Sequence, residues 1–494
     1  MNKTTVDIAF INPGDRKTVF QGLGADVTAI EPPYLIASAA AYLRQKNFSV
    51  AIIDANAENI SPAETAEKVK CMQPALVAII VYGNQPSAST QNMSISGAIA
   101  TAVQSATKSP VMMGGLHPSA LPELTFEQED IDFLIEGEVE VSLAQLLSAL
   151  KNGQNFSTVG GLWYRQNTIV MRNAKAALER NLDVQMPIAA WDLLPMEKYR
   201  AHNWHCFDDI HNRSPYAAIY TSLGCPYSCT FCCINTPFGQ PGLRVRSPEL
   251  VVAEIEFLVT EYGVKNLKFI DEMFILKERH YMAIAELIIE KNLDLNIWAY
   301  ARVDSVKEGT LKKLKQAGFN WLALGIESAD SAVRDGAAKK MRVDDIKSVV
   351  EKIQDAGIRV IGNYIFGLPD DTLDSMQETL EMAIELNCEF SNMYCAMAYP
   401  GSQLHQTALE EGWQLPDVWH GYSQHSYVMQ PLPSKVMAAK EIVQFRDNAF
   451  HQYFESDRYL SMLEEKFGLD VKLHMQEITQ SRLKRKILEE EVAL

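Results

Sequence analysis

Short apolar runs alternate with longer segments of helical period from residue 6 to about residue 150. The apolar runs, VDIAFIN, SVAIIDA, LVAIIVYG, PVMMGG and DFLIEGE, have the length of strands. The segments between them, residues 34–46, 62–72, 92–107 and 122–128, have the period of helices. Nearly continuous Val, Ile and Ala runs are typical of parallel strands that helices cover on both faces. The pattern therefore predicts an α/β fold whose N-terminal domain, residues 1–152, is doubly wound and Rossmann-like.

A second alternation begins at YAAIYTSLG, residues 216–224, and continues through NLKFIDE, NIWAYAR, WLALGIES, RVIGNYIFG and EFSNMYCAMAY. Helical segments such as 248–262 and 372–387 separate these runs. Six strand-helix units are fewer than the eight of a closed barrel, so residues 213–412 predict a partial (β/α)6 barrel. Residues 153–212 predict a linker that contains a hairpin, and residues 413–494 predict a helical C-terminal segment.

Composition and charge exclude several partners. The 494 residues include 45 Lys plus Arg against 62 Asp plus Glu, a formal net charge of −17. Such a surface repels a phosphate backbone, so we expect no nucleic acid partner. No apolar run has the length of a membrane span and the first residues lack a signal-peptide pattern, so we expect a cytoplasmic protein without a membrane partner. Eight cysteines in such a chain indicate metal or redox chemistry rather than a disulfide framework.

Four of these cysteines fall within nine residues, directly after the first strand of the predicted barrel. Cys225, Cys229 and Cys232 have the spacing C-x3-C-x2-C on one loop. Three thiolates on a short loop can hold three corners of a cubane iron-sulfur cluster and leave the fourth iron open. A zinc site would need Cys233 as a fourth ligand, but adjacent cysteines rarely reach two corners of one tetrahedron. The spacing favours iron-sulfur over zinc, with Cys233 as a packed thiol.

The carboxyl ends of the predicted first-domain strands are rich in glycine and polar residues. In open parallel sheets ligands bind at this edge, and here it carries NPG, YGNQPS, GGLHPS and EGEVE. Each turn taken alone is more simply an ordinary tight turn, but four together favour a surface for a large flat ligand. No G-x-G-x-x-G pattern follows the first strand, so a dinucleotide is disfavoured.

The cysteine loop, with aromatic Phe231 before its last cysteine, resembles that of the radical S-adenosylmethionine (radical SAM) enzymes. The resemblance extends through FIDEMF, ARVD, LGIES, FGLPDDT and YPGSQL at the ends of the later strands. It implies that the three cysteines hold a [4Fe-4S] cluster whose free iron is chelated by the amino and carboxylate groups of S-adenosylmethionine. An electron, from a donor such as flavodoxin or ferredoxin, then cleaves the sulfonium to methionine and a 5′-deoxyadenosyl radical.

S-adenosylmethionine carries a carboxylate, an ammonium, a ribose diol and an adenine, so its site needs a cation, an acid and an apolar slot. Arg302 suits the carboxylate, and Glu272 and Glu327 suit the ammonium or the ribose hydroxyls. Phe231 and the Gly367 backbone suit the adenine. The alternative for each charged residue is a salt bridge at a strand end.

The first domain resembles the cobalamin-binding domain that precedes the barrel in one large subgroup of that family. The matching segments are INPG, EPPYLIASAAAYLRQKNFSVAIIDAN, GGLHPSALPE and DFLIEGEVEVSL. The D-x-H-x-x-G signature that supplies a histidine to cobalt elsewhere is absent, which implies cobalt without a histidine below it. The residues that the resemblance places near cobalamin are Asn12, Gly14, Gly83, Ser87, Gly114, Gly115, His117, Gly137 and Glu138.

Together the resemblances, which cover residues 5–410, imply an enzyme in which the adenosyl radical removes hydrogen from a small organic substrate. Methylcobalamin would then supply a methyl group to the carbon radical. The candidates for contact with the substrate are Tyr300, Asn363, Tyr364 and Cys395, although strand residues of this kind are more often core. Two alternatives stay open, a cobalamin-assisted cyclisation or rearrangement and a non-catalytic cobalamin or redox sensor. Methylthiolation of transfer RNA would need a basic appendage, and the acidic composition offers none.

Overall fold

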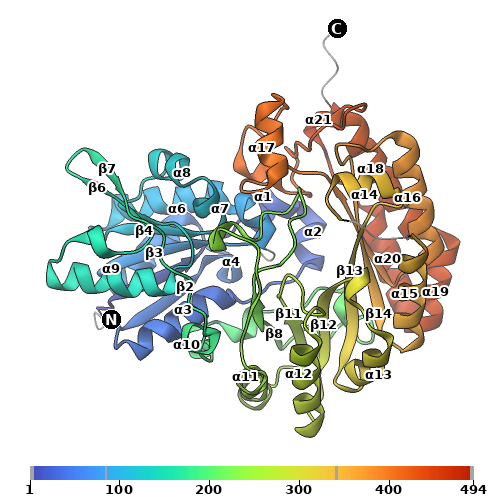
Figure 1. The fold of residues 1–494 in the computed structure, drawn as a ribbon, viewed down its shortest axis with the longest axis horizontal. Coiled ribbons are helices and arrows are strands. Elements are labelled where there is room, and N and C mark those ends of the chain that lie inside the picture. The colour runs from blue at the N-terminus through green and yellow to red at the C-terminus, as the bar shows by residue number, and fades with distance from the viewer. Residues whose placement is uncertain (1–4, 84–85, 340–342, 490–494) are drawn as a thin grey trace.

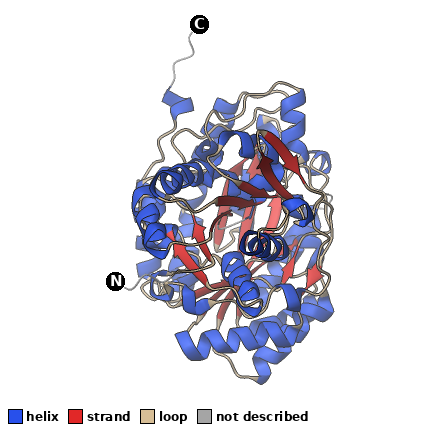
Figure 2. Cartoon of the chain, turned by 90° about the vertical axis from the view of Figure 1, so that its left-hand side faces the viewer, coloured by secondary structure: helices blue, strands red, loops and turns tan. Residues whose placement is uncertain are grey.

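Two sheets lie side by side, and together they form the centre of the molecule (Figure 1). The computed structural model describes residues 5–83, 86–339 and 343–489. The first sheet has seven strands and the second has six, and a separate two-stranded ladder lies beside the second. Figure 2 views the molecule from the side of the first domain, with helices packed around its strands. Within the described ranges, no helix is long and apolar enough to cross a membrane.

The first sheet has the order β2-β1-β3-β4-β5-β6-β7. Its parallel strands are β1 (Ile8–Asn12), β2 (Val50–Asp54), β3 (Leu76–Val81), β4 (Val111–Gly115) and β5 (Phe133–Ile135). One face is covered by α3 (Tyr34–Gln45) and α9 (Glu140–Asn152), and the other by α5 (Pro62–Met72) and α6 (Met93–Ala106). All six residues of β3 are buried, as the continuous apolar run predicts. The doubly wound prediction is confirmed.

The predicted hairpin belongs to the first sheet. Strands β6 (Leu162–Gln166) and β7 (Ile169–Arg172) pair antiparallel with each other, and β6 pairs antiparallel with β5. The indole N–H of Trp163 donates to the buried carboxylate of Glu136, which ties the hairpin to the end of β5. The sheet therefore extends twenty residues past the boundary at 152 that the sequence suggests.

Short helices complete the first domain and the connection to the second. They are α1 (Arg16–Phe20), α2 (Gly22–Val27), α4 (Ala55–Glu58), α7 (Leu116–Ala120), α8 (Pro122–Gln128) and α10 (Leu182–Gln185). Local sequence explains the ends of the longer helices: α5 starts with a capping box between Ser61 and Glu64, with Pro62 at its first position.

The second sheet is an open, curled, all-parallel half-barrel, which confirms the partial barrel. Its order is β15-β14-β13-β12-β11-β8. The strands are β8 (Tyr216–Ile219), β11 (Asn266–Phe269), β12 (Asn296–Arg302), β13 (Phe319–Glu327), β14 (Arg359–Phe366) and β15 (Phe390–Cys395). The helices of this half are α11 (Pro248–Tyr262), α12 (Glu278–Glu290), α13 (Glu308–Gln316), α14 (Ser331–Gly336), α15 (Val343–Asp355) and α16 (Leu373–Leu386).

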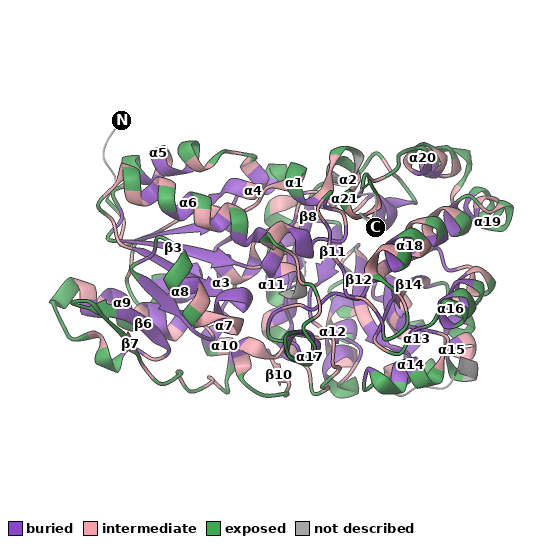
Figure 3. Cartoon of the chain, turned by 90° about the horizontal axis from the view of Figure 1, so that it is seen from above, coloured by how far each residue is buried: buried purple, intermediate pink, exposed green. Residues whose placement is uncertain are grey.

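The C-terminal segment covers the open edge of this half-barrel, as Figure 3 shows from above. Its helices are α18 (Ala439–Phe454), α19 (Asp457–Phe467), α20 (Leu469–Gln480) and α21 (Lys486–Glu489), and α17 (Gln403–Glu410) precedes the segment. Helix α18 packs along the edge strand β15, where Arg446 Nε donates to the Met393 carbonyl. An uncovered edge strand would expose unpaired peptide groups, and α18 prevents this.

Buried charges join the two halves of the molecule. The carboxylate of Glu254 on α11 pairs with Arg246 at 2.8 Å, and both side chains have 0% exposure. The same carboxylate accepts hydrogen bonds from the Tyr34 hydroxyl on α3 and from the Trp191 indole of the connection. We call Glu254, Arg246, Tyr34 and Trp191 the interdomain clamp. Because helix α3 belongs to the first domain and α11 to the barrel, the clamp fixes one against the other.

Candidate functional site

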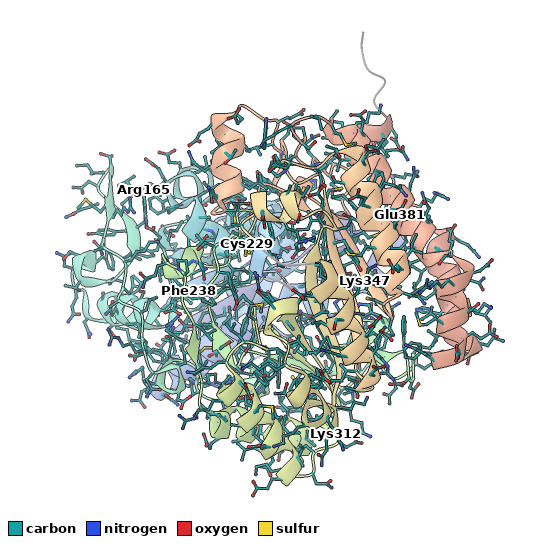
Figure 4. All side chains as sticks on the ribbon, turned by 45° about the vertical axis from the view of Figure 1, so that its right-hand side comes forward. Arg165, Cys229, Phe238, Lys312, Lys347 and Glu381 are labelled. Carbon is teal, nitrogen blue, oxygen red and sulfur yellow. The ribbon has the colours of Figure 1, made fainter. Side chains whose placement is uncertain are left out.

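The three cysteines lie on a loop that the short ladder closes at its base. Strands β9 (Ser222–Leu223) and β10 (Arg244–Val245) pair antiparallel on either side of the loop. Asn235 shapes the loop, because its Nδ2 donates to the carbonyls of Cys225 and Tyr227 while its Oδ1 accepts from the Cys225 amide. Gly224 enters the loop with φ +86°, a left-handed conformation that favours glycine. Figure 4 labels Cys229 near the centre of the molecule.

The thiols of Cys225, Cys229 and Cys232 are free and partly exposed, whereas Cys233 is buried. Burial raises the pKa of Cys225 to about 11 and also raises the pKa of Cys229 and Cys232, so these thiols must lose protons when they bind metal. Within the part of the chain that the structure describes, no three His, Cys, Asp or Glu side chains converge on a single ion. A cubane does not require such convergence, because each thiolate binds a different iron.

Arg302, at the end of β12, contacts the cysteine loop at two points. Its guanidinium lies 4.0 Å from the centroid of the Tyr227 ring, and its Nη1 lies 3.9 Å from the Cys229 sulfur. Its Nε and Nη2 pair with the two oxygens of Asp304 at 2.9 and 3.1 Å. The structure thus places a cation directly beside the thiols, where the sequence suggests one.

Glu327, at the end of β13, already has a cationic partner. Its carboxylate pairs with Lys339, and both side chains are less than 10% exposed. Glu327 adopts a left-handed backbone with φ +67°, which a residue with a side chain adopts only when its surroundings hold it. The charges of Lys339 and Glu327 both act on the Cys229 thiol. Lys339 is not predictable from the sequence, since the residues around it carry no motif.

Phe231 and Gly367 lie in the same region. Phe231 packs against Leu368 and Val333 in one apolar cluster and against Ala398 in another. Gly367 has φ +80°, and its amide donates to the Asp371 carboxylate. A side chain at Gly367 would clash with Ile442 of α18. The Phe231 ring therefore packs among apolar side chains, whereas the Gly367 amide is already hydrogen-bonded within the protein.

Glu272 faces the first domain. Its Oε2 is buried and accepts a hydrogen bond from no residue that the structure describes. Burial, with the nearby charge of Asp271, raises the pKa of Glu272 to about 8, so the carboxyl is mostly neutral at pH 7. Asp271 itself is fully used by the Thr221 amide and hydroxyl and the Ser222 hydroxyl.

Glu272→Gln should become progressively more stable relative to the native protein as pH rises. The unfolded carboxyl ionises near pH 4.5 and the folded one near pH 8. The unfolded state therefore loses its proton first, and the native protein loses stability across this window. Urea midpoints of the cofactor-free protein, measured at about pH 5 and pH 8, test this. Glu256→Gln, on the exposed side of α11, is the control, and a pH-independent difference for Glu272→Gln contradicts the assignment.

Two small voids lie between the first-domain strand ends and the barrel. One, of about 70 Å³, is lined by Asn12 and Gly83 among others, and the other, of about 30 Å³, by Glu138 and Glu272. Three side chains border both voids, namely Leu35, Tyr82 and Tyr220. No histidine is among the described residues that line either void.

The other strand-end candidates have different surroundings. Side chains at Gly14 and Gly114 would collide with Asn56 and Val139, and one at Gly115 would collide with the Val81 backbone. These three glycines therefore permit close packing within the first domain.

Gly137 and His117 contact other parts of the chain. Gly137, with φ +106°, lies against the Pro237 carbonyl and so brings the first domain up to the cysteine loop. His117 is buried, with its Nδ1 bonded to Thr90 and its ring edge-on to Trp419 at 4.7 Å. Burial lowers the pKa of His117 to about 3, so the ring is neutral. The Ser87 side chain lies outside the described part of the structure.

A larger cavity, of about 410 Å³, fills the inside of the half-barrel. Tyr300 lines it, but Asn363, Tyr364 and Cys395 are not among the described residues that do. Asn363 instead accepts a hydrogen bond from the side chain of Asn392, which lines the cavity. Tyr364 points to the opposite face of β14, toward the buried Cys388. Neighbouring residues of a strand face opposite sides, so Asn363 and Tyr364 cannot both face inward. Cys395 is held at its backbone by the Gln424 side chain.

Comparison with known proteins identifies the family. The profile described as the radical SAM superfamily matches residues 219–383, and that of the B12 binding domain matches residues 21–147. An uncharacterized methyltransferase of Pyrococcus horikoshii is 30% identical over 401 residues, which are 81% of this chain and 83% of that protein. The chain is a cobalamin-binding radical SAM enzyme.

Other known proteins are also similar to this chain. An anaerobic magnesium-protoporphyrin IX monomethyl ester cyclase of Rubrivivax gelatinosus is 24% identical over 81% of this chain and 69% of its own length. The methyltransferase TsrM of Kitasatospora setae has a similar fold, with a TM-score of 0.65 and 19% identity over 82% of this chain and 76% of that one. The enzyme OxsB also has a similar fold, with a TM-score of 0.68 and 16% identity over 96% of this chain and 72% of that one. The domain pair and the methyltransferase relatives support cobalamin-dependent methyl transfer.

The described residues suit the cofactors of a cobalamin-binding radical SAM enzyme, which are a [4Fe-4S] cluster, S-adenosylmethionine and cobalamin. The three unpaired thiols supply the soft ligands that iron prefers, and Cys233 is sequestered from them. At the strand ends, amide, hydroxyl and peptide groups match the amide side chains of a corrin. A corrin is larger than both voids together, and Leu35, Tyr82 and Tyr220 are the side chains that border both.

Proposed function

We propose that this enzyme methylates an unactivated carbon of a small organic substrate. The observation that carries the proposal is a single interface where two strand-end edges meet. Tyr220 and Ile270 of the barrel line the same void as Asn12 and Gly83 of the first domain. Phe20 borders both that void and the 410 Å³ cavity. An enzyme that holds the cofactors and the substrate in one enclosed interface brings the reacting groups close together, which lowers the barrier to reaction.

Each cofactor supplies one kind of chemistry. When bound, the cluster supplies the electron that cleaves S-adenosylmethionine, and cobalamin supplies a methyl carrier. The chain supplies position and exclusion of water: Asn235 shapes the ligand loop, and the interdomain clamp keeps the two ligand edges opposed. We further propose a reduced flavodoxin or ferredoxin as electron donor.

The charged residues around Cys229 suit the polar groups of S-adenosylmethionine. Arg302 and Lys339 lie nearest, and Glu327 balances Lys339. We assign the carboxylate to Arg302 and the ammonium or ribose hydroxyls to Glu327, with the adenine beside Phe231. Glu272 lines the void toward the first domain, so we place it between the cysteine loop and the cobalamin.

Arg302→Lys should raise the apparent KM for S-adenosylmethionine by about tenfold or more. A lysine keeps the charge but cannot make the two-pronged pair with Asp304 or the stack on Tyr227, so the cation loses its position. Formation of 5′-deoxyadenosine against substrate concentration measures this. Arg279→Lys, an exposed change on α12, is the matched control and should leave KM unchanged. Equal KM values for both variants would remove Arg302 from the site.

Anaerobic turnover with S-adenosylmethionine labelled in its methyl group tests the proposed function. The reconstituted enzyme, reduced and supplied with fractionated metabolites, should yield a labelled small molecule together with S-adenosylhomocysteine and 5′-deoxyadenosine. Formation of 5′-deoxyadenosine with no transferred label would indicate cyclisation or rearrangement instead. Absence of any cleavage under reducing conditions would indicate a sensor.

A further inference from the structure

The 410 Å³ cavity has walls from several parts of the chain, and the first domain (Phe20) and the connection (Trp204) each contribute a side chain. The inner face of the half-barrel contributes aromatic side chains, and the C-terminal segment closes the opposite side with α18 and α20. The Phe, Tyr and Trp residues that line it are Phe20, Trp204, Trp298, Tyr300, Phe390, Tyr394 and Phe450. A cavity of this size and lining suits a drug-sized organic molecule with a flat apolar body.

A second, open cavity of about 330 Å³ lies at the surface beside the first. Asn448, His451 and Arg482 line both cavities, so the surface cavity is the mouth of the inner one. Every residue of the mouth belongs to the C-terminal segment, which lies outside the ranges that the two family profiles match.

In the part of the chain that the structure describes, the charged side chains in and around the two cavities are paired with one exception. Asp447 binds Arg446 at 2.7 Å and Arg485 at 3.0 Å, and His451 binds Glu455 at 2.7 Å. Arg482 is exposed, and among the residues of the described ranges it has neither an ion pair nor a hydrogen bond. A guanidinium without a partner at the entrance of an apolar cavity is a recognition group for a carboxylate or a phosphate.

A buried donor inside the cavity also lacks a partner. Trp298 is 3% exposed and lines the cavity, and its indole N–H has no hydrogen bond to any residue that the structure describes. Buried N–H groups are normally paired, so this donor is available to an acceptor on a bound molecule. The cavity thus offers an apolar body site, neutral donors such as the Trp298 indole, and an unpaired cation at its mouth.

We propose that the cavity binds an amphiphilic substrate, with a flat apolar body inside the half-barrel and an anionic carboxylate or phosphate group at Arg482. The protein is acidic overall and repels anions, so we expect an anionic substrate group to enter beside the unpaired guanidinium of Arg482. The inference rests on the proposed function only in naming the occupant a substrate, since binding needs no turnover.

Titration calorimetry of the reconstituted enzyme with three probes of one shape tests the proposal. The probes are biphenyl-4-carboxylate, biphenyl-4-yl phosphate and the neutral biphenyl-4-methanol. At least one anionic probe should bind about tenfold more tightly than the neutral probe, and the tighter of the two anions identifies the group. Arg482→Gln should abolish this preference and leave the neutral probe unchanged. Arg279→Gln, which removes the same charge from α12, should preserve it.

Ala323→Phe places a ring in the cavity from the inner face of β13 and should weaken all three probes. Tight binding of every probe to Ala323→Phe would show that they bind elsewhere and would overturn the proposal. Equal affinities of anionic and neutral probes in the native enzyme, or a preference that survives Arg482→Gln, would also overturn it. Failure of methyl transfer leaves these binding results intact, so the two proposals fail separately.

Discussion

Changing Cys225, Cys229 and Cys232 together to alanine is expected to abolish iron binding and to reduce 5′-deoxyadenosine formation to background. The three free thiols are the soft ligands that the described site provides beside Arg302, and their loop is shaped by backbone contacts to Asn235 rather than by the sulfurs. The fold should therefore persist while the metal is lost. Iron and sulfide content after anaerobic reconstitution, with circular dichroism for the fold, measures both effects.

Cys233→Ala is the matched control, because this adjacent thiol is 1% exposed and packs within the protein. It should retain iron and cleavage of S-adenosylmethionine. Iron content that is undiminished in the triple variant, or zinc in the reconstituted native protein, would contradict the assignment of the loop.

Glu254→Ala is expected to destabilise the folded protein by about 3–5 kcal/mol. The substitution leaves the buried Arg246 guanidinium without its counterion and removes the acceptor for Tyr34 and Trp191. An unpaired charge in a site with no solvent exposure is among the most destabilising changes known for single residues. Because these partners come from both halves of the molecule, both halves should unfold at lower urea concentration.

Glu256→Ala provides the comparison on the same helix. Glu256 pairs with Lys291 at 2.7 Å on the surface, with side chains 46% and 37% exposed. Exposed pairs contribute little, so the expected change is within about 1 kcal/mol. Similar shifts in the urea midpoints of the two variants would show that the interdomain clamp does not join the domains energetically.

The sequence predicts the fold well where periodicity is strong. The helices expected at 34–46, 62–72 and 92–107 correspond to α3, α5 and α6 within one residue at each end. This agreement arises because apolar residues recur with different periods in buried strands and in amphipathic helices. The boundary at 152 is less accurate. The β6–β7 hairpin joins the first sheet through pairing with β5, a long-range contact that local pattern does not encode.

In the candidate site, too, features encoded by local sequence are predictable and features that depend on long-range contacts are not. The cysteine spacing is local, so the ligand loop is readable from the sequence, and Arg302 at a strand end is placed beside it. Asn363 and Tyr364 are neighbours on β14, so strand alternation places them on opposite faces, and only the structure shows which face lies toward the cavity. Lys339 and Arg482 carry no motif, and only the tertiary structure brings them to Glu327 and to the cavity mouth.

A cluster held by Cys225, Cys229 and Cys232 should keep one iron open for S-adenosylmethionine. Electron-nuclear double resonance of the reduced, reconstituted enzyme tests it most directly, with S-adenosylmethionine carrying ¹⁵N in its amino group. A hyperfine coupling between the ¹⁵N nucleus and the cluster spin is the predicted result, and it should vanish in the triple cysteine variant. A cluster signal that S-adenosylmethionine leaves unchanged, with no ¹⁵N coupling, would contradict the account.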